Sequence, residues 1–431
     1  MTFKELGLNE ALQEAISFMG FENATPIQEQ AIPIILDGKD ILACAQTGTG
    51  KTAAFILPIL NILTDKPKDG IKTLVIAPTR ELAMQIEQQV QGFSYFAGVS
   101  SISIYGGGSG AEFHEEKEAL KNGTDIIVAT PGKLISHLNM GYADFSSVEF
   151  LILDEADRML DMGFFEDIQR IVKALPGKRQ TLLFSATFPP KIKKLAQNIL
   201  IDHAEIRLAV SKPAAGVLQA AYLVHDEHKT SLIKYLIDQK PSYESIIIFT
   251  GTKKNVNNIV RGLYNSKYEV KAVSSDLVQK DREDALRKFK SKQTRVLVAT
   301  DVLSRGIDIK GINLVINYDV PSDGEDYVHR VGRTARADST GVALTLVNTD
   351  DMYKLKRIER LIESEVPKVP IPPEIGKSPE WDPKPRGRSY GGRSGGKSGR
   401  NQGGGRGHGG RNNGGRSGGN RKGPRKGGPR R

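Results

Sequence analysis

The sequence has a single cysteine, Cys44, among 431 residues, which excludes an intramolecular disulfide framework. Long apolar runs are also missing, since the most apolar stretch, "AAFILPILNIL", is far shorter than the ~20 residues that a membrane-spanning helix requires. The N-terminus "MTFKELGLNE" carries acidic residues and lacks the apolar segment of a secretory signal. These absences argue against secreted disulfide scaffolds and helical membrane proteins, and we expect a soluble, cytoplasmic protein.

Acidic residues are absent from the C-terminal stretch 384–431, which holds 15 Lys or Arg and 19 Gly. The rest of the chain carries 46 Lys or Arg against 50 acidic residues, so the net charge of +11 comes from this stretch. The proline-rich "VPKVPIPPEIGKSPEWDPKP" precedes it. Segments of such composition bury too little apolar surface to offset their ordering entropy. We therefore expect residues 369–431 to form a disordered tail, with a solubilising extension as its simplest role.

Short runs of Val, Ile and Leu alternate with amphipathic stretches along the remaining sequence. The first set is "DILACA", "TLVIAP", "SISIYG", "DIIVAT", "FLILDE", "TLLFSAT" and "EIRLAV", and the second is "AYLV", "SIIIFT", "VKAVS", "RVLVAT", "LVINYD" and "VALTLV". Their nearly continuous apolar character is typical of parallel strands covered by helices on both faces. We predict an α/β protein with two tandem lobes, residues 1–210 and 217–368, joined by a linker at 211–216. The similar stretches "IVATP" and "LVATD" hint at a duplicated plan.

The stretch "AQTGTGKT" follows the expected strand "DILAC" and precedes an apolar, helix-compatible stretch. This order of strand, glycine loop and helix is what a phosphate-binding loop requires. Lys51 can reach the outer phosphates of a nucleotide, and the Thr52 hydroxyl can bind Mg²⁺. A plain glycine-rich turn is the alternative. The expected loop residues are Ala45, which stands where the usual pattern has Gly, with Gln46, Thr47, Gly48, Thr49, Gly50, Lys51 and Thr52.

The stretch "FLILDEADRML" sets four apolar residues directly against the acidic residues Asp154, Glu155 and Asp157. Nucleotide-hydrolysing proteins with this kind of loop need a carboxylate at the end of a buried neighbouring strand to hold Mg²⁺, and Asp154 is placed for that role. Glu155 can orient and deprotonate the attacking water. An acidic helix N-cap is the alternative interpretation. Together with Lys51 and Thr52, these residues predict a nucleotide-hydrolysing site.

The residues Asp-Glu-Ala-Asp at 154–157, with the glycine loop upstream, resemble the DEAD-box family of ATP-dependent RNA helicases over about residues 3–350. The short core with a basic Gly/Arg-rich tail is similar to the bacterial, RhlE-like type. The resemblance implies two RecA-like lobes, use of ATP and Mg²⁺, and an RNA-stimulated ATPase. It also implies sequence-independent RNA binding and local unwinding that requires closure of the cleft between the lobes.

The resemblance assigns further residues to the ATP site. "GFENATPIQ" is similar to an adenine-recognition motif, in which Gln28 pairs with the adenine edge and Phe21 stacks on the base. Phe3 matches the isolated aromatic upstream of that motif, and Asp308 in "ATDVLSRGIDI" matches the ribose-binding aspartate. The implied catalytic residues are Lys51, Asp154, Glu155 and the arginine fingers Arg333 and Arg336, and the implied coupling residues are Asp157, Ser185, Thr187, His329 and Arg330. A solvated helix face is the alternative for the arginines of "YVHRVGRTAR".

The RNA path implied by the resemblance follows strand ends, in "PTRELA", "GGG" and "TPGK" of the first lobe. Such segments supply hydroxyls, glycine backbone and helix N-termini, which suit phosphates and 2′-OH groups rather than base edges. The implied RNA-binding residues are Arg80, Gly107, Thr130, Lys133, Thr250, Arg282 and Thr300. Lys133 stands where the family has Arg and loses the bidentate fork, while Ser274 and Ser275 replace a common His-Gly pair and receive no role. The tail would add a nonspecific RNA tether.

The sequence leaves two other function classes open. One is a related two-lobe motor that translocates on DNA, against which the motif containing Gln28 argues. The other is a noncatalytic RNA-binding scaffold that uses ATP only as a latch, against which Lys51, Glu155, Arg333 and Arg336 argue. We expect a monomer, with RNA as its main partner and ribonucleoprotein or RNA-decay proteins as further partners.

Overall fold

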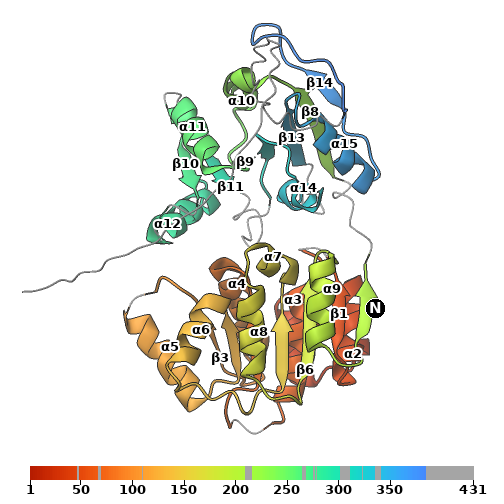
Figure 1. Cartoon of the computed structure of the whole chain (residues 1–431), viewed down its shortest axis with the longest axis vertical. Coiled ribbons are helices and arrows are strands. Elements are labelled where there is room, and N and C mark those ends of the chain that lie inside the picture. Colours follow the sequence, from red (N-terminus) through yellow and green to blue (C-terminus); the bar gives the residue numbers. More distant parts are fainter. Residues whose placement is uncertain are drawn as a thin grey trace, which may run out of the picture. The chain divides into compact units, whose positions relative to one another are not determined.

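The computed structural model describes residues 1–45, 48–66, 69–108, 110–208, 216–264, 268–274, 277, 279–300, 311–322, 324–334 and 341–384. These residues form two α/β lobes, each built on one seven-stranded sheet (Figure 1). The strand pairings of both sheets are parallel, which confirms the expected fold class. Among the described residues, no helix has the length and apolar character needed to cross a membrane.

The first lobe contains the strands of one sheet in the order β3-β4-β2-β5-β6-β1-β7. These strands are β1 (Ile41–Cys44), β2 (Thr73–Ile76), β3 (Ser101–Ile104), β4 (Ile126–Ala129), β5 (Phe150–Leu153), β6 (Gln180–Ser185) and β7 (Ala204–Arg207). Its helices are η1 (Phe3–Leu6), α1 (Glu10–Phe18), α2 (Pro26–Leu36), α3 (Lys51–Leu63), α4 (Arg80–Ser94), α5 (Gly110–Asn122), α6 (Pro131–Asn139), α7 (Ala156–Asp161), α8 (Phe165–Lys173) and α9 (Pro190–Ile199).

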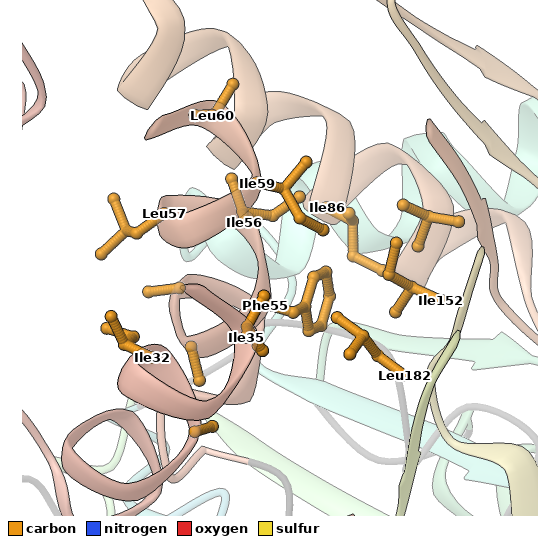
Figure 2. Close-up of a cluster of buried hydrophobic side chains, with 14 of the residues drawn as sticks. Ile32, Ile35, Phe55, Ile56, Leu57, Ile59, Leu60, Ile86, Ile152 and Leu182 are labelled. Carbon is orange, nitrogen blue, oxygen red and sulfur yellow. The ribbon is translucent and has the colours of Figure 1, made fainter. Parts of the chain in front are cut away.

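Two apolar clusters hold the first lobe together, one on each face of its sheet. Phe55 of α3 lies between the helices and the sheet and points toward Ile152 of β5 and Leu182 of β6 (Figure 2). Its ring centroid is 5.2 Å from that of Phe184. Leu151 and Leu183 point to the opposite face and join the second cluster, because successive side chains of a strand alternate between faces. Burial on both faces explains why the strands are apolar throughout.

The order of strands sets where the functional segments meet. In a parallel sheet all carboxyl ends of the strands lie at one edge, so the segments after β1 and β5 share that edge. We expected the acidic strand to be the direct neighbour of the strand before the glycine loop. This expectation is wrong, since β6 lies between β1 and β5. The segment at the end of β6, Ser185 to Thr187, therefore begins between the glycine loop and the acidic residues.

The second lobe repeats the plan of the first, with the order β10-β11-β9-β12-β13-β8-β14. Its strands are β8 (Val217–Leu223), β9 (Ile246–Thr250), β10 (Val270–Val273), β11 (Val296–Thr300), β12 (Leu314–Asn317), β13 (Gly341–Val347) and β14 (Lys368–Pro370). Its helices are η2 (Asp226–His228), α10 (Lys229–Asp238), α11 (Lys253–Tyr264), α12 (Gln279–Lys290), α14 (Gly324–Val331) and α15 (Met352–Leu361). Numbered from their own first strands, the two orders are identical. "IVATP" and "LVATD" belong to the equivalent strands β4 and β11, so the hint of duplication is confirmed at the level of topology.

The second lobe extends beyond the boundary that the sequence predicted at residue 368. Strand β14 pairs with β8 through Pro370, Ile371 is buried, and Trp381 packs against the lobe's apolar cluster. The Lys368 ammonium lies 4.9 Å from the centroid of the Trp381 ring. The expected start of the tail at 369 is therefore too early. Residues 385–431, and the linker up to residue 215, lie outside the described residues.

Candidate nucleotide and RNA sites

The glycine loop ends at the first turn of α3. Gly48 and Gly50 have φ of +87° and +90°, values that side chains with a Cβ rarely adopt. Lys51 is the first residue of α3, and its side chain is buried although it carries an ammonium group. Gln46 and Thr47 lie outside the described residues. Gly48 to Thr52 therefore have the turn and the helix N-terminus that a phosphate-binding loop requires.

Gln28 joins the N-terminal motif to this loop. Its Nε2 donates to the carbonyl of Gly50 at 3.0 Å, and its Oε1 accepts from the amide of Thr25 at 2.9 Å. The side chain is buried, and its amide keeps one further N–H and one lone pair for an adenine edge. Phe21 is 39% exposed and packs against Phe3 and Phe93, so its ring is held in place while one side stays accessible.

Asp154 is the first residue after β5 and lies beside Lys51. The Lys51 Nζ and the Asp154 Oδ1 are 3.8 Å apart, and both side chains are buried. Burial raises the pKa of Asp154 to about 6, with the nearby charge of Glu155 adding to the rise and that of Lys51 opposing it. A buried acid of this kind lies in an environment that favours further positive charge.

Glu155 has an unusual backbone for a non-glycine residue. Its φ of 48° and ψ of 49° place it in the left-handed region, immediately before α7. Such conformations cost of order 1–3 kcal/mol and cluster at functional sites. The Nη1 of Arg158, one turn along α7, donates to the Glu155 Oε2 at 3.3 Å. The left-handed turn thus holds a buried carboxylate directly before α7.

The residues at this rim fit a magnesium ion and the phosphates of a nucleotide. Within the described residues the Lys51 ammonium has no hydrogen-bond partner, although it is buried. Asp154 provides a carboxylate, and Thr52, on the first turn of α3, provides a hydroxyl. Among the described residues no group of three or more His, Cys, Asp or Glu could hold a metal ion. This donor set suits Mg²⁺, which is commonly bound through one or two carboxylates together with substrate phosphates.

Asp157 connects the acidic segment to the segment after β6. Its Oδ2 accepts hydrogen bonds from both the amide and the hydroxyl of Thr187, each at 3.1 Å. The Ser185 hydroxyl donates to the carbonyl of Thr187 at 2.7 Å. Asp157 therefore contacts the segment that contains Ser185 and Thr187, two of the other implied coupling residues. These bonds fix the loop that lies between the two halves of the nucleotide site.

The first-lobe residues expected to bind RNA lie after β2, β3 and β4 at the same edge of the sheet. Arg80 begins α4, and its guanidinium lies 4.9 Å from the centroid of the Tyr105 ring. Gly107 passes so close that a Cβ there would lie 2.7 Å from the Arg80 Nη1. Thr130 is the N-cap residue of α6. The segments form one rim of polar backbone, as expected.

Lys133 is held within the first lobe by an ion pair. Its Nζ lies 2.8 Å from the Oε2 of Glu116 and 5.0 Å from the centroid of the Phe113 ring. His137 lies 3.0 Å from the same carboxylate oxygen. Burial lowers the pKa of His137, against the opposing effect of Glu116. Contact between Lys133 and RNA would therefore have to compete with Glu116.

In the second lobe, α14 carries His329 and Arg330, and Arg333 follows two residues after its end. Arg330 is buried, and its Nη1 donates to the Asn317 Oδ1 at 3.3 Å and to the carbonyl of Asp319 at 3.0 Å. Arg333 and His329 are nearly buried. The alternative of a solvated helix face is therefore wrong for Arg330 and Arg333. Arg336 and Asp308 lie outside the described residues.

The second-lobe residues expected to bind RNA differ in exposure. Thr250 ends β9 and is buried, and its hydroxyl donates to the Asp319 Oδ2 at 2.5 Å. Thr300 ends β11 and is also nearly buried, while the Arg282 side chain on α12 is 13% exposed. A direct RNA contact by the Thr250 side chain is not available in this conformation. The exposed surface beside it belongs to Gly251 and Thr252. Ser274 is buried, and Ser275 lies outside the described residues.

Comparison with known families agrees with this geometry. Residues 25–195 match the family model described as DEAD/DEAH box helicase, and residues 227–338 match the helicase conserved C-terminal domain. A DEAD-box ATP-dependent RNA helicase CshA from Geobacillus kaustophilus is 41% identical over 373 residues, which span 86% of this chain and 79% of the relative. The chain belongs to the DEAD-box family of ATP-dependent RNA helicases.

Another DEAD-box relative and two solved structures are also similar to this chain. An ATP-dependent RNA helicase CshA from Limosilactobacillus reuteri is 43% identical over 86% of this chain and 74% of the relative. The structure of S. cerevisiae Dbp5 bound to RNA and ADP BeF3 has a TM-score of 0.75, with 30% identity over 86% of this chain and 95% of that chain. That of Mss116p bound to ssRNA and AMP-PNP has a TM-score of 0.77, with 28% identity over 87% of this chain and 81% of that chain.

Sequence reasoning missed several residues that support this DEAD-box site. Arg158 binds the predicted base Glu155, Tyr105 lies against Arg80, and Glu116 pairs with Lys133. The spacing of Arg158 from Glu155, three residues along a helix, was a signal that could have been used. Glu116 and Tyr105 lie far along the sequence from their partners Lys133 and Arg80, so no short sequence pattern identifies them.

Proposed function

We propose that this chain is an RNA-stimulated ATPase that binds RNA without sequence preference and separates short duplexes locally, with Mg²⁺ as its cofactor. The observation that carries the proposal is the pair of buried charges Lys51 and Asp154 at the edge where the glycine loop ends. Burying an ammonium and a carboxylate is costly, so the pair is expected where a charged ligand uses it. The solved structures bound to RNA and to ATP analogues support the same assignment.

In this proposal the glycine loop binds the phosphates of ATP. The amides of Gly48 to Thr52 surround the phosphates, and Lys51 neutralises the outer ones. Thr52 and Asp154 would hold Mg²⁺, which supplies charge neutralisation at the transferred phosphate. Gln28 contacts the carbonyl of Gly50, so an adenine that pairs with Gln28 would reinforce the shape of the loop.

Glu155 is the proposed general base. Its carboxylate is buried next to Asp154, and Arg158 restricts its orientation. It would orient the attacking water and take up its proton. Arg333, and Arg336 beyond the described residues, would approach the γ-phosphate after closure of the lobes and stabilise the transition state. Asp157 and Thr187 would transmit the state of the site to the RNA rim.

The proposal is tested with Glu155→Gln, which keeps the size of the side chain and removes the base. We expect ATP and RNA to bind within about twofold of wild type while phosphate release falls by about 10² or more. Glu14→Gln changes an exposed acid of the same lobe and serves as the control, with turnover unchanged. Turnover of Glu155→Gln at the wild-type rate would contradict the assignment of the base.

A second assay separates this proposal from a motor that translocates on DNA. ATPase activity of the wild-type protein is measured with RNA and with DNA of the same sequence. We expect stimulation by RNA to be much greater, because the RNA rim offers backbone donors suited to the 2′-OH. Equal stimulation by both nucleic acids would favour the DNA motor.

A further inference from the structure

The second lobe contains a buried lysine and a carboxylate in positions that correspond to those of the nucleotide site. Lys229 is the first residue of α10, the first α-helix after β8, just as Lys51 is the first residue of α3 after β1. The Lys229 Nζ lies 3.7 Å from the Asp319 Oδ1, and its side chain is 1% exposed. The first-lobe ammonium lies 3.8 Å from its carboxylate.

The register of the two sheets shows that the two carboxylates differ in position by one residue. The amide of Asp154, directly after β5, donates to the carbonyl of Ile76 in β2. The amide of Tyr318, directly after β12, donates to the carbonyl of Phe249 in the equivalent strand β9. Asp319 therefore takes the position of Glu155, one residue further along.

The second lobe does not use this pair for a phosphate. The connection from β8 to α10 has the sequence "VHDEH", without the glycines of a phosphate loop. The Asp226 Oδ1 lies 2.9 Å from the Lys229 Nζ, so a carboxylate of the chain itself neutralises the lysine. Partial burial of Asp226 is outweighed by its bonds to Lys229 and Asn348, which lower its pKa.

Asp319 directs its other oxygen to the end of β9. The Asp319 Oδ2 accepts from the Thr250 hydroxyl at 2.5 Å, from the Gly251 amide at 3.0 Å and from the Asn255 Nδ2 at 3.3 Å. These donors lie in or next to the exposed segment 251–254, "GTKK", whose last two residues begin α11. The backbone carbonyl of Asp319 in turn accepts a hydrogen bond from Arg330 of α14.

We propose that Asp319, with its charge balanced by the buried Lys229, is a positioning residue that holds the segment 251–254 in the shape that contacts the RNA backbone. The inference rests on the proposed function. It reassigns Thr250 from a direct RNA contact to a support for its exposed neighbours. A lysine and carboxylate pair that serves the nucleotide in one lobe thus serves the RNA-binding surface in the other.

The test compares two variants of the full-length protein in an RNA-stimulated ATPase assay. Asp319→Asn removes the charge at constant size, and Thr250→Val removes one of the three donors. For Asp319→Asn we expect the KM for RNA to rise about tenfold, as for loss of a charge-assisted hydrogen bond network, and for Thr250→Val a smaller rise in the same direction. In both variants, kcat and the ATPase rate without RNA should stay within about twofold of wild type. A variant that failed to fold would lose both.

The matched control is Asp226→Asn. Asp226 shares the partner Lys229, but its side chain is 70% exposed and does not bond to the segment 251–254. We expect its KM for RNA to stay within about twofold of wild type. The inference would be overturned, and the proposed function would stand, if the KM for RNA rose equally in Asp226→Asn and Asp319→Asn. The same would follow if this KM did not rise in Asp319→Asn while RNA still stimulated the wild type. A wild-type ATPase that RNA does not stimulate would overturn the proposed function and this inference with it.

Discussion

Gly50 and Gln28 constrain each other at the centre of the nucleotide site. The loop must turn through a positive φ at Gly50, and the carbonyl of that same residue accepts from the Gln28 amide. A Cβ at position 50 would lie 2.5 Å from the Gln28 Nε2. The glycine is thus required both by the turn and by the close approach of a residue 22 positions earlier in the chain.

Gly50→Ala is expected to weaken ATP binding by about tenfold or more, because the strained backbone and the displaced Gln28 both disturb the phosphate loop. Isothermal titration with a nonhydrolysable ATP analogue measures the effect. Gly177→Ala is the control, since a Cβ there meets nothing within 4 Å. Equal affinity for the analogue in Gly50→Ala and wild type would show that the close approach has no role in binding.

Individual residues of the nucleotide site could be predicted where they lie in a short, recognisable sequence pattern. Lys51, Asp154 and Glu155 lie in short patterns whose chemistry is readable without a fold. Asp319 could not be found in this way, because its importance comes from the register between β9 and β12. The hydrogen bond of the Thr250 hydroxyl could not be found in this way either, since its acceptor Asp319 lies 69 positions away.

Strand β14 is the element that sequence analysis missed. The stretch around it, "VPKVPIPP", is proline-rich, and proline cannot donate to a sheet. At the edge of a sheet this is tolerated, because one side of the strand has no neighbour. β14 lies at the edge of its sheet, next to β8, and corresponds to β7 in the first lobe. The duplicated plan could have predicted it, whereas composition could not.

The segment after β14 is expected to stabilise the second lobe through Trp381. Trp381→Ala removes a ring that packs against the apolar cluster and against Lys368, and we expect it to lower the free energy of unfolding by about 2 kcal/mol, less than for a fully buried tryptophan. Thermal unfolding checks this. Glu380→Ala, at an exposed neighbour, should leave stability unchanged. Identical melting of Trp381→Ala and wild type would mean that the segment contributes nothing to the lobe.

The described residues form four apolar clusters, and each belongs to a single lobe. Two consist of residues between Phe3 and Leu208, and two of residues between Val217 and Trp381. Within the described residues, each lobe therefore has its own core on both faces of its sheet. The two-lobe division was predictable from the recurrence of apolar runs. The RhlE-like type, the cytoplasmic location and the monomeric state stay predictions.

The basic tail is expected to add RNA affinity that depends strongly on salt. Truncation after Pro383 keeps Trp381 and removes 15 basic residues. We expect RNA affinity at low salt to fall by about tenfold or more, and the slope of log affinity against log salt to become shallower. A full-length chain with those residues replaced by Gln separates charge from length and should behave like the truncation. Unchanged affinity at low salt would contradict the tether.

The edge position of β14 has a consequence for how the chain is made. Each sheet is completed by a strand that comes last in its own lobe, β7 in the first and β14 in the second. During synthesis the first lobe can assemble both of its cores before the second begins to emerge. The second sheet is complete once Pro370 is available, while the residues from 385 onward are still being translated. A nascent chain can thus leave the ribosome with both sheets already formed.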